Sequence, residues 1–204
     1  MARIDHIVYA VPDLDAGIEH FTSATGVRPA FGGAHVRRGS HNALVSFGSC
    51  YLELIAPDPN QPDPVGPRPF GLDDLAGPAF VAFAVRPDPG DTIDALVERA
   101  RTAGHDAGPV SDMQRATPDG GLLEWRLTMP AATMPAVIPF VIDWGDTPLP
   151  STTQPGGVEL SSFAVRHPNV EVISAAFVAL DLSVPVTSGE PGFDATITGP
   201  AGTF

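Results

Sequence analysis

A short strand-like pattern returns three times along the chain, and this repetition is the feature that most constrains the fold. The stretches 3–11, 80–86 and 161–166 each read as a β-strand that contains an aromatic residue or histidine together with Ala and Val, followed by a turn and an amphipathic segment. Self-similarity of this kind marks a repeated supersecondary unit. The chain is therefore expected to use β–α units three times. Only the first copy carries a histidine, His6, in mid-strand, and this asymmetry indicates where chemistry would lie.

Residues 1–59 are expected to form a complete βαβββ module. Alternation along the first strand places Ile4 and His6 on the same face. Asp13 is suited to cap a helix that would cover the opposite face. The fourth strand carries Glu53 among apolar residues, where burying a carboxylate is costly unless it is paired or binds a metal ion.

Residues 78–148 repeat the βαβββ pattern after a Pro-rich linker at residues 60–77. Their helix is expected to be capped by Asp91 and to carry apolar residues at helical spacing. Residues 149–204 start the pattern again but look shortened. The predicted fold class is therefore α+β, with tandem βαβββ modules and a truncated third βα extension.

Charge and composition narrow the classes of function. The formal net charge is −13 and no basic patch is visible, so neither nucleic acid nor an anionic membrane is expected as a partner. All 11 basic residues are Arg, which excludes a Schiff-base lysine and a phosphate-loop lysine.

The single cysteine, Cys50, precludes an intrachain disulfide. No signal peptide is apparent at the N-terminus, and the apolar stretch 129–142 is too short and too rich in proline to span a bilayer. The sequence therefore predicts a cytoplasmic location.

The tandem modules, the mid-strand histidine and the glutamate of the fourth strand resemble the vicinal oxygen chelate superfamily, and within it the glyoxalase-like domain group. The stretches that carry the resemblance are Ile4-Asp5-His6-Ile7-Val8, Gly39-Ser40-His41-Asn42-Ala43-Leu44, Tyr51-Leu52-Glu53-Leu54-Ile55-Ala56-Pro57-Asp58-Pro59, Trp125-Arg126-Leu127 and Pro139-Phe140-Val141-Ile142-Asp143-Trp144. The resemblance implies a curved mixed sheet around a concave site. Many members of the superfamily are dimers, so it also implies a homodimer as one arrangement of this chain.

The resemblance also implies that His6 and Glu53 lie on neighbouring strands, on the face used as the site. Imidazole and carboxylate are suitable ligands for Zn²⁺, Mn²⁺, Fe²⁺, Ni²⁺ or Co²⁺. The alternative is a His–Glu hydrogen bond inside the barrel. His41 could complete a two-His, one-carboxylate set, act in catalysis beside Glu53, or bind substrate together with Asn42. Its other reading is an ordinary turn residue.

The second and third copies depart from the family pattern. Phe80 and Leu160 fall where His6 falls in the first copy, which puts a complete metal site in question. Asp143 could supply a carboxylate, although a register change of one residue would turn it to the other face.

Arg126 could clamp an anionic substrate group, since Arg suits bidentate carboxylate recognition, or it could be a surface residue of its strand. Trp125, Tyr51 and Phe80 could form an aromatic floor for a ligand.

Two functions remain open at this point. By resemblance, the protein is a glyoxalase-like metalloenzyme of the lyase, isomerase or dioxygenase type that acts on a small oxygen-bearing metabolite. The alternative is a metal-free protein of the same fold that binds or sequesters a small molecule, as the bleomycin-resistance members do.

Overall fold

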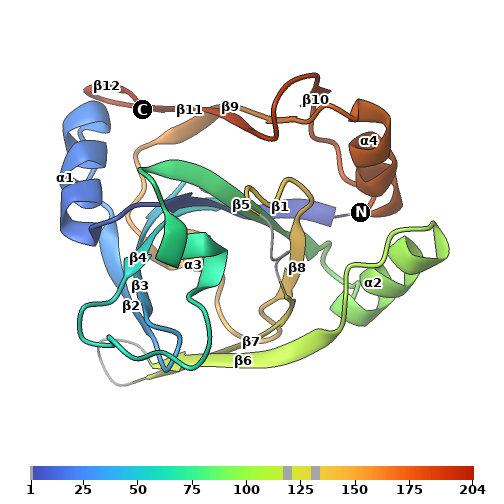
Figure 1. The fold of residues 1–204 in the computed structure, drawn as a ribbon, viewed down its shortest axis with the longest axis horizontal. Coiled ribbons are helices and arrows are strands. Elements are labelled where there is room, and N and C mark those ends of the chain that lie inside the picture. The colour runs from blue at the N-terminus through green and yellow to red at the C-terminus, as the bar shows by residue number, and fades with distance from the viewer. Residues whose placement is uncertain (1, 117–120, 130–133) are drawn as a thin grey trace.

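A computed structural model describes residues 2–116, 121–129 and 134–204 of the chain. In this part of the chain, eight strands form one curled mixed sheet (Figure 1). They are β1 (Ala2–Ala10), β2 (Ala30–His35), β3 (Ser40–Ser46), β4 (Tyr51–Pro57), β5 (Ala79–Pro87), β6 (Val110–Ala116), β7 (Leu122–Thr128) and β8 (Phe140–Asp143).

The order of the strands confirms the predicted tandem modules. Across the sheet they run β2-β3-β4-β1-β5-β8-β7-β6. In each half the first strand is parallel to the fourth, β1 to β4 and β5 to β8, and the halves meet where β1 and β5 pair antiparallel. The edge strands β2 and β6 also contact each other, so the sheet curls most of the way round.

Helices α1 (Leu14–Thr25) and α2 (Ile93–Thr102) lie on the convex side of this sheet. Asp13 caps α1, as predicted, by accepting a hydrogen bond from the backbone N–H of Ala16 at 2.8 Å. The cap predicted for α2 is wrong: the Thr92 side chain accepts from Ala95, whereas Asp91 pairs with Arg99. In the described part of the chain, no helix has the length and apolar character that crossing a membrane requires.

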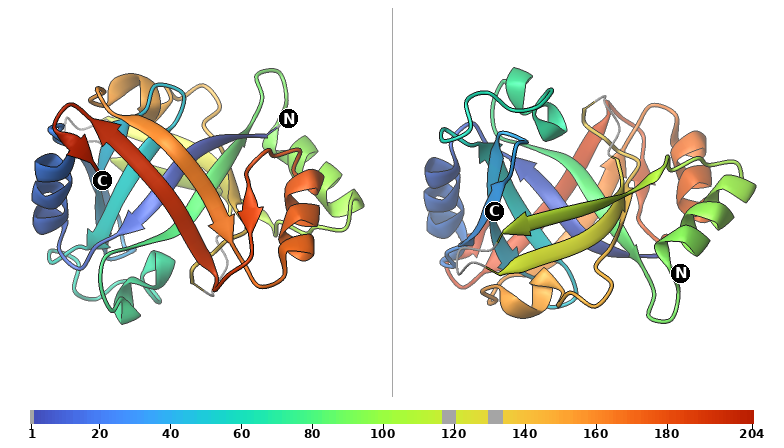
Figure 2. Two further views of the ribbon diagram at one scale, coloured as in Figure 1. Left: turned by 90° about the horizontal axis from the view of Figure 1, so that it is seen from above. Right: turned by 90° about the horizontal axis from the view of Figure 1, so that it is seen from below.

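The C-terminal part forms its own small sheet rather than extending the large one. Its elements are α3 (Pro150–Thr153), β9 (Glu159–Arg166), α4 (Val170–Ala179), β10 (Val186–Thr187), β11 (Gly192–Gly199) and β12 (Gly202–Thr203). Figure 2 shows β9 and β11 crossing over β1 and β5, between α1 and α4. The fully buried Phe83 of β5 joins the two sheets, with ring centroids 5.2 Å from Phe163 and 5.9 Å from Phe193.

Two β-bulges in the β1–β5 pair change which side chains face the concave side. Ile4 pairs with Val85 and His6 with Ala84, so Asp5 is an extra residue between them. As a result Ile4 packs into the core beneath the helices, and the prediction that it shares a face with His6 is wrong.

The segment 60–77, predicted to be a linker, contains the 3₁₀ helix η1 (Pro69–Asp74). Leu72 of η1 is buried, and Phe70 packs against the core cluster on the concave side. The segment therefore covers part of the concave face in addition to joining the modules. The predicted module boundaries remain a proposal.

Candidate functional site

The concave face of the large sheet holds a cavity of about 480 Å³. The first module supplies most of the polar side chains of its wall, His6, His35, Arg38, Asn42 and Glu53, together with the ring of Tyr51 and three aliphatic side chains, Val36, Leu44 and Ile55. The second module supplies mainly apolar side chains: Met113, Trp125, Leu127, Phe140, Ile142 and Trp144. Phe70 of η1 and Met134 also line it. The cavity thus has one polar end inside a largely apolar enclosure.

His6 and Glu53, the pair expected from the sequence, meet at this polar end. His6 Nε2 lies 3.6 Å from Glu53 Oε2, beyond ordinary hydrogen-bonding distance. Both residues are buried, with 3% and 7% of their surface exposed. Because β1 and β4 are neighbouring parallel strands, both side chains reach the same face. Two ionisable groups therefore face one cavity with a short gap between them.

Asp5 holds the His6 ring from behind. Its Oδ1 lies 2.7 Å from His6 Nδ1, and it also accepts from Trp144 Nε1 at 3.3 Å. Arg86 Nη1 donates to Asp5 Oδ2 at 3.3 Å, which compensates the charge of this buried carboxylate. Since a carboxylate accepts, these partners assign a proton to Nδ1 and leave Nε2 facing Glu53 and the cavity. The bulge at Asp5 makes this contact between adjacent residues feasible.

Asn42 and His35 occupy the other side of the Glu53 carboxylate. Asn42 Nδ2 donates to Glu53 Oε1 at 2.6 Å, and His35 Nε2 lies 3.8 Å from the same oxygen. His35 Nδ1 is 2.9 Å from Ser40 Oγ. Asn42 was expected at the site, but sequence reasoning missed His35. The signal was the hairpin register: His35 pairs with Ser40, two residues from Asn42, so the three share a face.

Aromatic rings form the wall beside this polar group. Tyr51 stacks on His6 with centroids 4.7 Å apart and planes 24° apart, and Phe140 meets the same ring edge-on at 5.5 Å. Trp125 packs on Trp144 at 5.3 Å. The structure thus places two of the three predicted floor residues, Tyr51 and Trp125, in the cavity wall.

Phe80, the third of them, lies on the opposite face. A second bulge pairs Val8 with Ala82 but Tyr9 with Phe80. The Phe80 ring therefore packs on Tyr9 at 4.8 Å and near Phe204 at 6.5 Å, beneath the C-terminal sheet. The prediction that Phe80 contributes to the ligand floor is corrected by this register shift.

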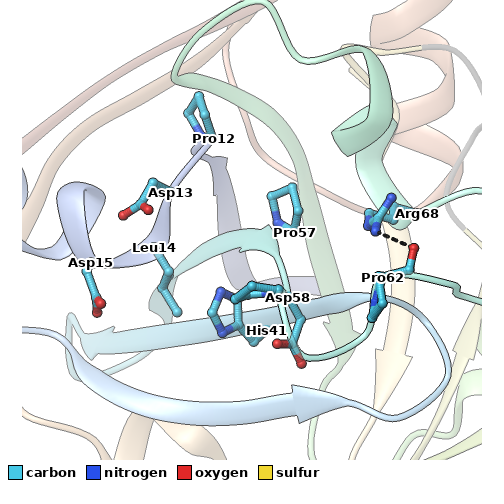
Figure 3. A pocket seen from close by; sticks show the side chains of 10 residues that line it. Pro12, Asp13, Leu14, Asp15, His41, Pro57, Asp58, Pro62 and Arg68 are labelled. Atoms are coloured by element: carbon cyan, nitrogen blue, oxygen red, sulfur yellow. Dashed lines mark hydrogen bonds between the residues drawn. The ribbon is translucent and has the colours of Figure 1, made fainter.

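His41 is not brought to His6 and Glu53. It lines a separate cavity of about 410 Å³ together with Leu14 and Pro57. Figure 3 shows it beside Asp58 there. Asn42 and Leu44 of the same strand face the main cavity, so alternation turns His41 the other way. The predicted set His6–Glu53–His41 is therefore not assembled.

Arg126 also lies outside the cavity. Its guanidinium forms two hydrogen bonds, 2.7 and 3.0 Å long, with Asp94 of α2, and these bonds hold the pKa of the Asp94 carboxyl below its usual value. Asp143 likewise faces α2, where it accepts from Gly145 N at 3.0 Å and Ile93 N at 3.4 Å. Neither residue is placed to contact a ligand in the main cavity.

The resemblance implies a divalent metal ion at this site. His6, Glu53 and His35 have suitable nitrogen and oxygen donors. Among the described residues, however, no group of three or more His, Cys, Asp or Glu side chains is arranged to hold a metal ion. From β8, which corresponds in the second module to β4, only the apolar side chains of Phe140 and Ile142 line the cavity. In this arrangement the side chains around His6 and Glu53 do not form a complete coordination sphere for a metal ion.

Comparison with known proteins identifies the family of the chain. The glyoxalase-like domain family matches residues 4–180. No curated protein matches the chain. Among solved structures, a hypothetical protein from Staphylococcus aureus shares the fold, with 15% identity and a TM-score of 0.68 over 94% of this chain and 88% of that one.

Two methylmalonyl-CoA epimerases are also similar, with TM-scores below 0.5. The enzyme from Mycobacterium tuberculosis has 21% identity and a TM-score of 0.42 over 68% of this chain and 84% of that one. The enzyme from Streptomyces coelicolor, in complex with 2-nitronate-propionyl-CoA, has 22% identity and a TM-score of 0.45 over 69% and 95%. With the family match spanning most of its length, the chain belongs to the glyoxalase-like domain family.

Proposed function

We propose that the protein is an isomerase- or lyase-type enzyme that moves a proton on a small carbonyl-bearing molecule bound in the main cavity. The observation that carries the proposal is the pair formed by the buried Glu53 carboxylate and His6 Nε2, 3.6 Å apart at the polar end of an otherwise apolar cavity. Such a pair can hold one proton and pass it between a carbon and an oxygen of a ligand between them.

In the proposed step, Glu53 removes a proton from the carbon next to the carbonyl group. The C–H electron pair forms a C=C bond and the carbonyl π electrons move to the oxygen. His6, when its ring is protonated, donates the Nε2 proton to that oxygen, and Asp5 stabilises the ring through Nδ1. Glu53 then holds the abstracted proton and His6 is neutral. For a hydroxyketone, Glu53 then returns its proton to the former carbonyl carbon, and the hydroxyl group on the first carbon becomes the new carbonyl as its proton passes to His6. This completes an isomerisation and restores both residues.

The remaining residues position this chemistry. Asn42 donates to Glu53 Oε1 and so fixes the carboxylate while Oε2 stays directed towards His6. Tyr51 and Phe140 hold the His6 ring by stacking and edge contacts. The apolar side chains of the second module exclude water, which strengthens electrostatic interactions at the polar end.

Deuterium exchange tests the proposal without knowledge of the full reaction. A panel of diketones, hydroxyketones and 2-oxo acids is incubated in D₂O with the protein, and carbon-bound deuterium is measured by mass spectrometry. We expect incorporation into at least one compound and a loss of about 10²- to 10⁴-fold in Glu53→Gln. Glu124→Gln, which neutralises an exposed carboxylate on β7 outside the cavity, is the matched control. Equal exchange in Glu53→Gln and the wild type would contradict the role of Glu53.

Metal analysis belongs to the same experiment. The metal content of protein purified without a chelator or a metal-affinity tag is measured by plasma mass spectrometry, for the wild type and His6→Ala. About one equivalent of a transition metal that is lost in His6→Ala would show that His6 is a metal ligand. That result would replace the metal-free step proposed above.

The second candidate is a binding or sequestering protein without catalysis. The observation that favours it is the aromatic wall formed by Tyr51, Trp125, Phe140 and Trp144, which suits a flat ligand. Tight binding of a panel compound without deuterium incorporation would support this candidate over the enzyme.

A further inference from the structure

The main cavity opens to solvent beside the hairpin turn between β2 and β3. Three apolar side chains that line the cavity are well exposed, Val36 at 60%, Val65 at 60% and Met129 at 46%. His6 and Glu53, by contrast, are almost completely buried. The exposed residues therefore mark the mouth and the polar pair marks the closed end. A ligand that fills the cavity must pass from one environment to the other.

Arg38 lies in the lining at this mouth and is exposed. Among the described residues, no carboxylate pairs with its guanidinium. This is unusual in a chain with 24 acidic residues and only 11 arginines. Ion pairs engage most of the other arginines: Arg3, Arg28, Arg68, Arg86, Arg99, Arg101, Arg126 and Arg166.

The turn that carries Arg38 is fixed in place. Gln61 Oε1 accepts a hydrogen bond from the backbone N–H of Arg37 at 2.7 Å, and Arg37 O accepts from Val65 N at 2.8 Å. Arg68 Nε donates to Gly39 O at 2.9 Å. These contacts come from the segment 60–77, so the position of Arg38 at the mouth does not depend on ordering by a ligand.

The carboxylates near the mouth leave Arg38 available. Asp73 is engaged by Arg68, whose Nη1 donates to it at 2.6 Å, and hydrogen bonds from Arg68 hold the pKa of Asp73 below its usual value. Asp74 also lines the cavity, from η1. It opposes an anionic ligand, so replacing it by Asn should strengthen anion binding.

We infer that Arg38 recognises an anionic group of the ligand at the cavity mouth. The ligand class is then an elongated molecule with an apolar body in the cavity and a carboxylate or phosphate group at Arg38. The further expectation that its inner end carries a carbonyl group rests on the proposed function of Glu53 and His6. Arg38 thus takes the anion-binding role that the sequence suggested for Arg126, whose guanidinium is already paired outside the cavity.

A matched pair of fluorescent probes tests the inference. 1-Anilinonaphthalene-8-sulfonate and N-phenyl-1-naphthylamine share a ring system, but only the first carries a negative charge. Both tryptophans of the chain, Trp125 and Trp144, line the cavity, so energy transfer from tryptophan reports a probe bound there. Dissociation constants are measured for the wild type, Arg38→Gln and Arg37→Gln. Arg37→Gln is the control, because it removes the same charge from the same turn and Arg37 does not line the cavity.

We expect Arg38→Gln to raise the dissociation constant of the sulfonate probe about fivefold, as for the loss of one exposed ion pair. The dissociation constant of the neutral probe should not change. Arg37→Gln should change neither. Raising the salt concentration to about 0.5 M should remove most of the difference, because it screens exposed charges. Equal weakening of both probes, or an equal effect of Arg37→Gln, would overturn the inference, as would the absence of energy transfer.

The same assay separates this inference from the proposed chemistry. Glu53→Gln should retain the selectivity for the sulfonate probe while it loses deuterium exchange. If Glu53→Gln keeps full exchange and Arg38→Gln still loses the sulfonate probe selectively, the proposed function fails and the inference stands. If Glu53→Gln loses exchange and Arg38→Gln binds both probes as the wild type does, the proposed function stands and the inference about Arg38 fails.

Discussion

The first module brings most of the polar side chains to the shared cavity, including His6 and Glu53, whereas the second brings mainly apolar ones, although both have the same strand order. At the concave face, β1 and β4 carry His6 and Glu53, whereas β5 and β8 carry Ala84 and Phe140. The backbone topology therefore repeats while the chemistry does not. The cavity is thus divided between a half suited to proton transfer and a half suited to holding a ligand.

Among changes that leave His6 and Glu53 themselves in place, Asp5→Asn should give the largest effect on this division. The change weakens the acceptor that orients His6 Nδ1, so we expect deuterium exchange at saturating ligand to fall about 10- to 100-fold, with little change in ligand affinity. Urea unfolding measures separately the stability lost when Arg86 and Trp144 keep only a neutral partner. A fall in affinity as large as the fall in rate would break the proposed division.

Trp125→Leu tests the other half. Trp125 lines the cavity from β7 and packs on Trp144. Losing its ring area should weaken the neutral naphthylamine probe about tenfold, because burial of aromatic surface drives its binding. The rate of deuterium exchange at saturation should stay close to that of the wild type. A large loss of rate with unchanged affinity would assign chemistry to the second module.

The smallest expected effects concern the helices that support each half. Asp13→Ala in the first module and Thr92→Ala in the second each remove a side-chain cap, and each should lower the free energy of unfolding by about 1 kcal/mol. Asp91→Ala, which removes the capping residue expected from the sequence, should cost less because it breaks an exposed ion pair. Urea unfolding measures the free energy of unfolding of the three variants. A larger loss for Asp91→Ala than for Thr92→Ala would indicate that Asp91 is the cap of α2.

Local sequence patterns predicted much of the fold because strand and helix periods are set by the backbone. The alternation in β4 placed Glu53 opposite Leu52 and Leu54, and the structure has Leu52 and Leu54 in the core beneath the helices. The same rule, applied strictly, separates His41 from Asn42 and Arg126 from Trp125, since adjacent residues of a strand face opposite sides. The two members of each pair therefore cannot line the same cavity from a regular strand.

The other errors come from features that a single strand does not encode. A bulge is visible only against the partner strand, and the two bulges between β1 and β5 turned Ile4 and Phe80 away from the predicted face. The role of His35 depended on the register of a hairpin, and the position of the C-terminal sheet depended on long-range packing around Phe83. Pairing between distant segments decided all of these.

One polypeptide carries both modules, and β1 pairs antiparallel with β5. The whole cavity therefore forms within a single chain. If two identical one-module chains formed such a cavity, symmetry would make every substitution appear twice, once in each wall. Covalent joining removes that constraint. A mutation in β8 alters one wall and leaves β4 as it was. The duplicated halves are therefore free to evolve at different rates, so ligand preference can change without disturbing the residues that act on the ligand.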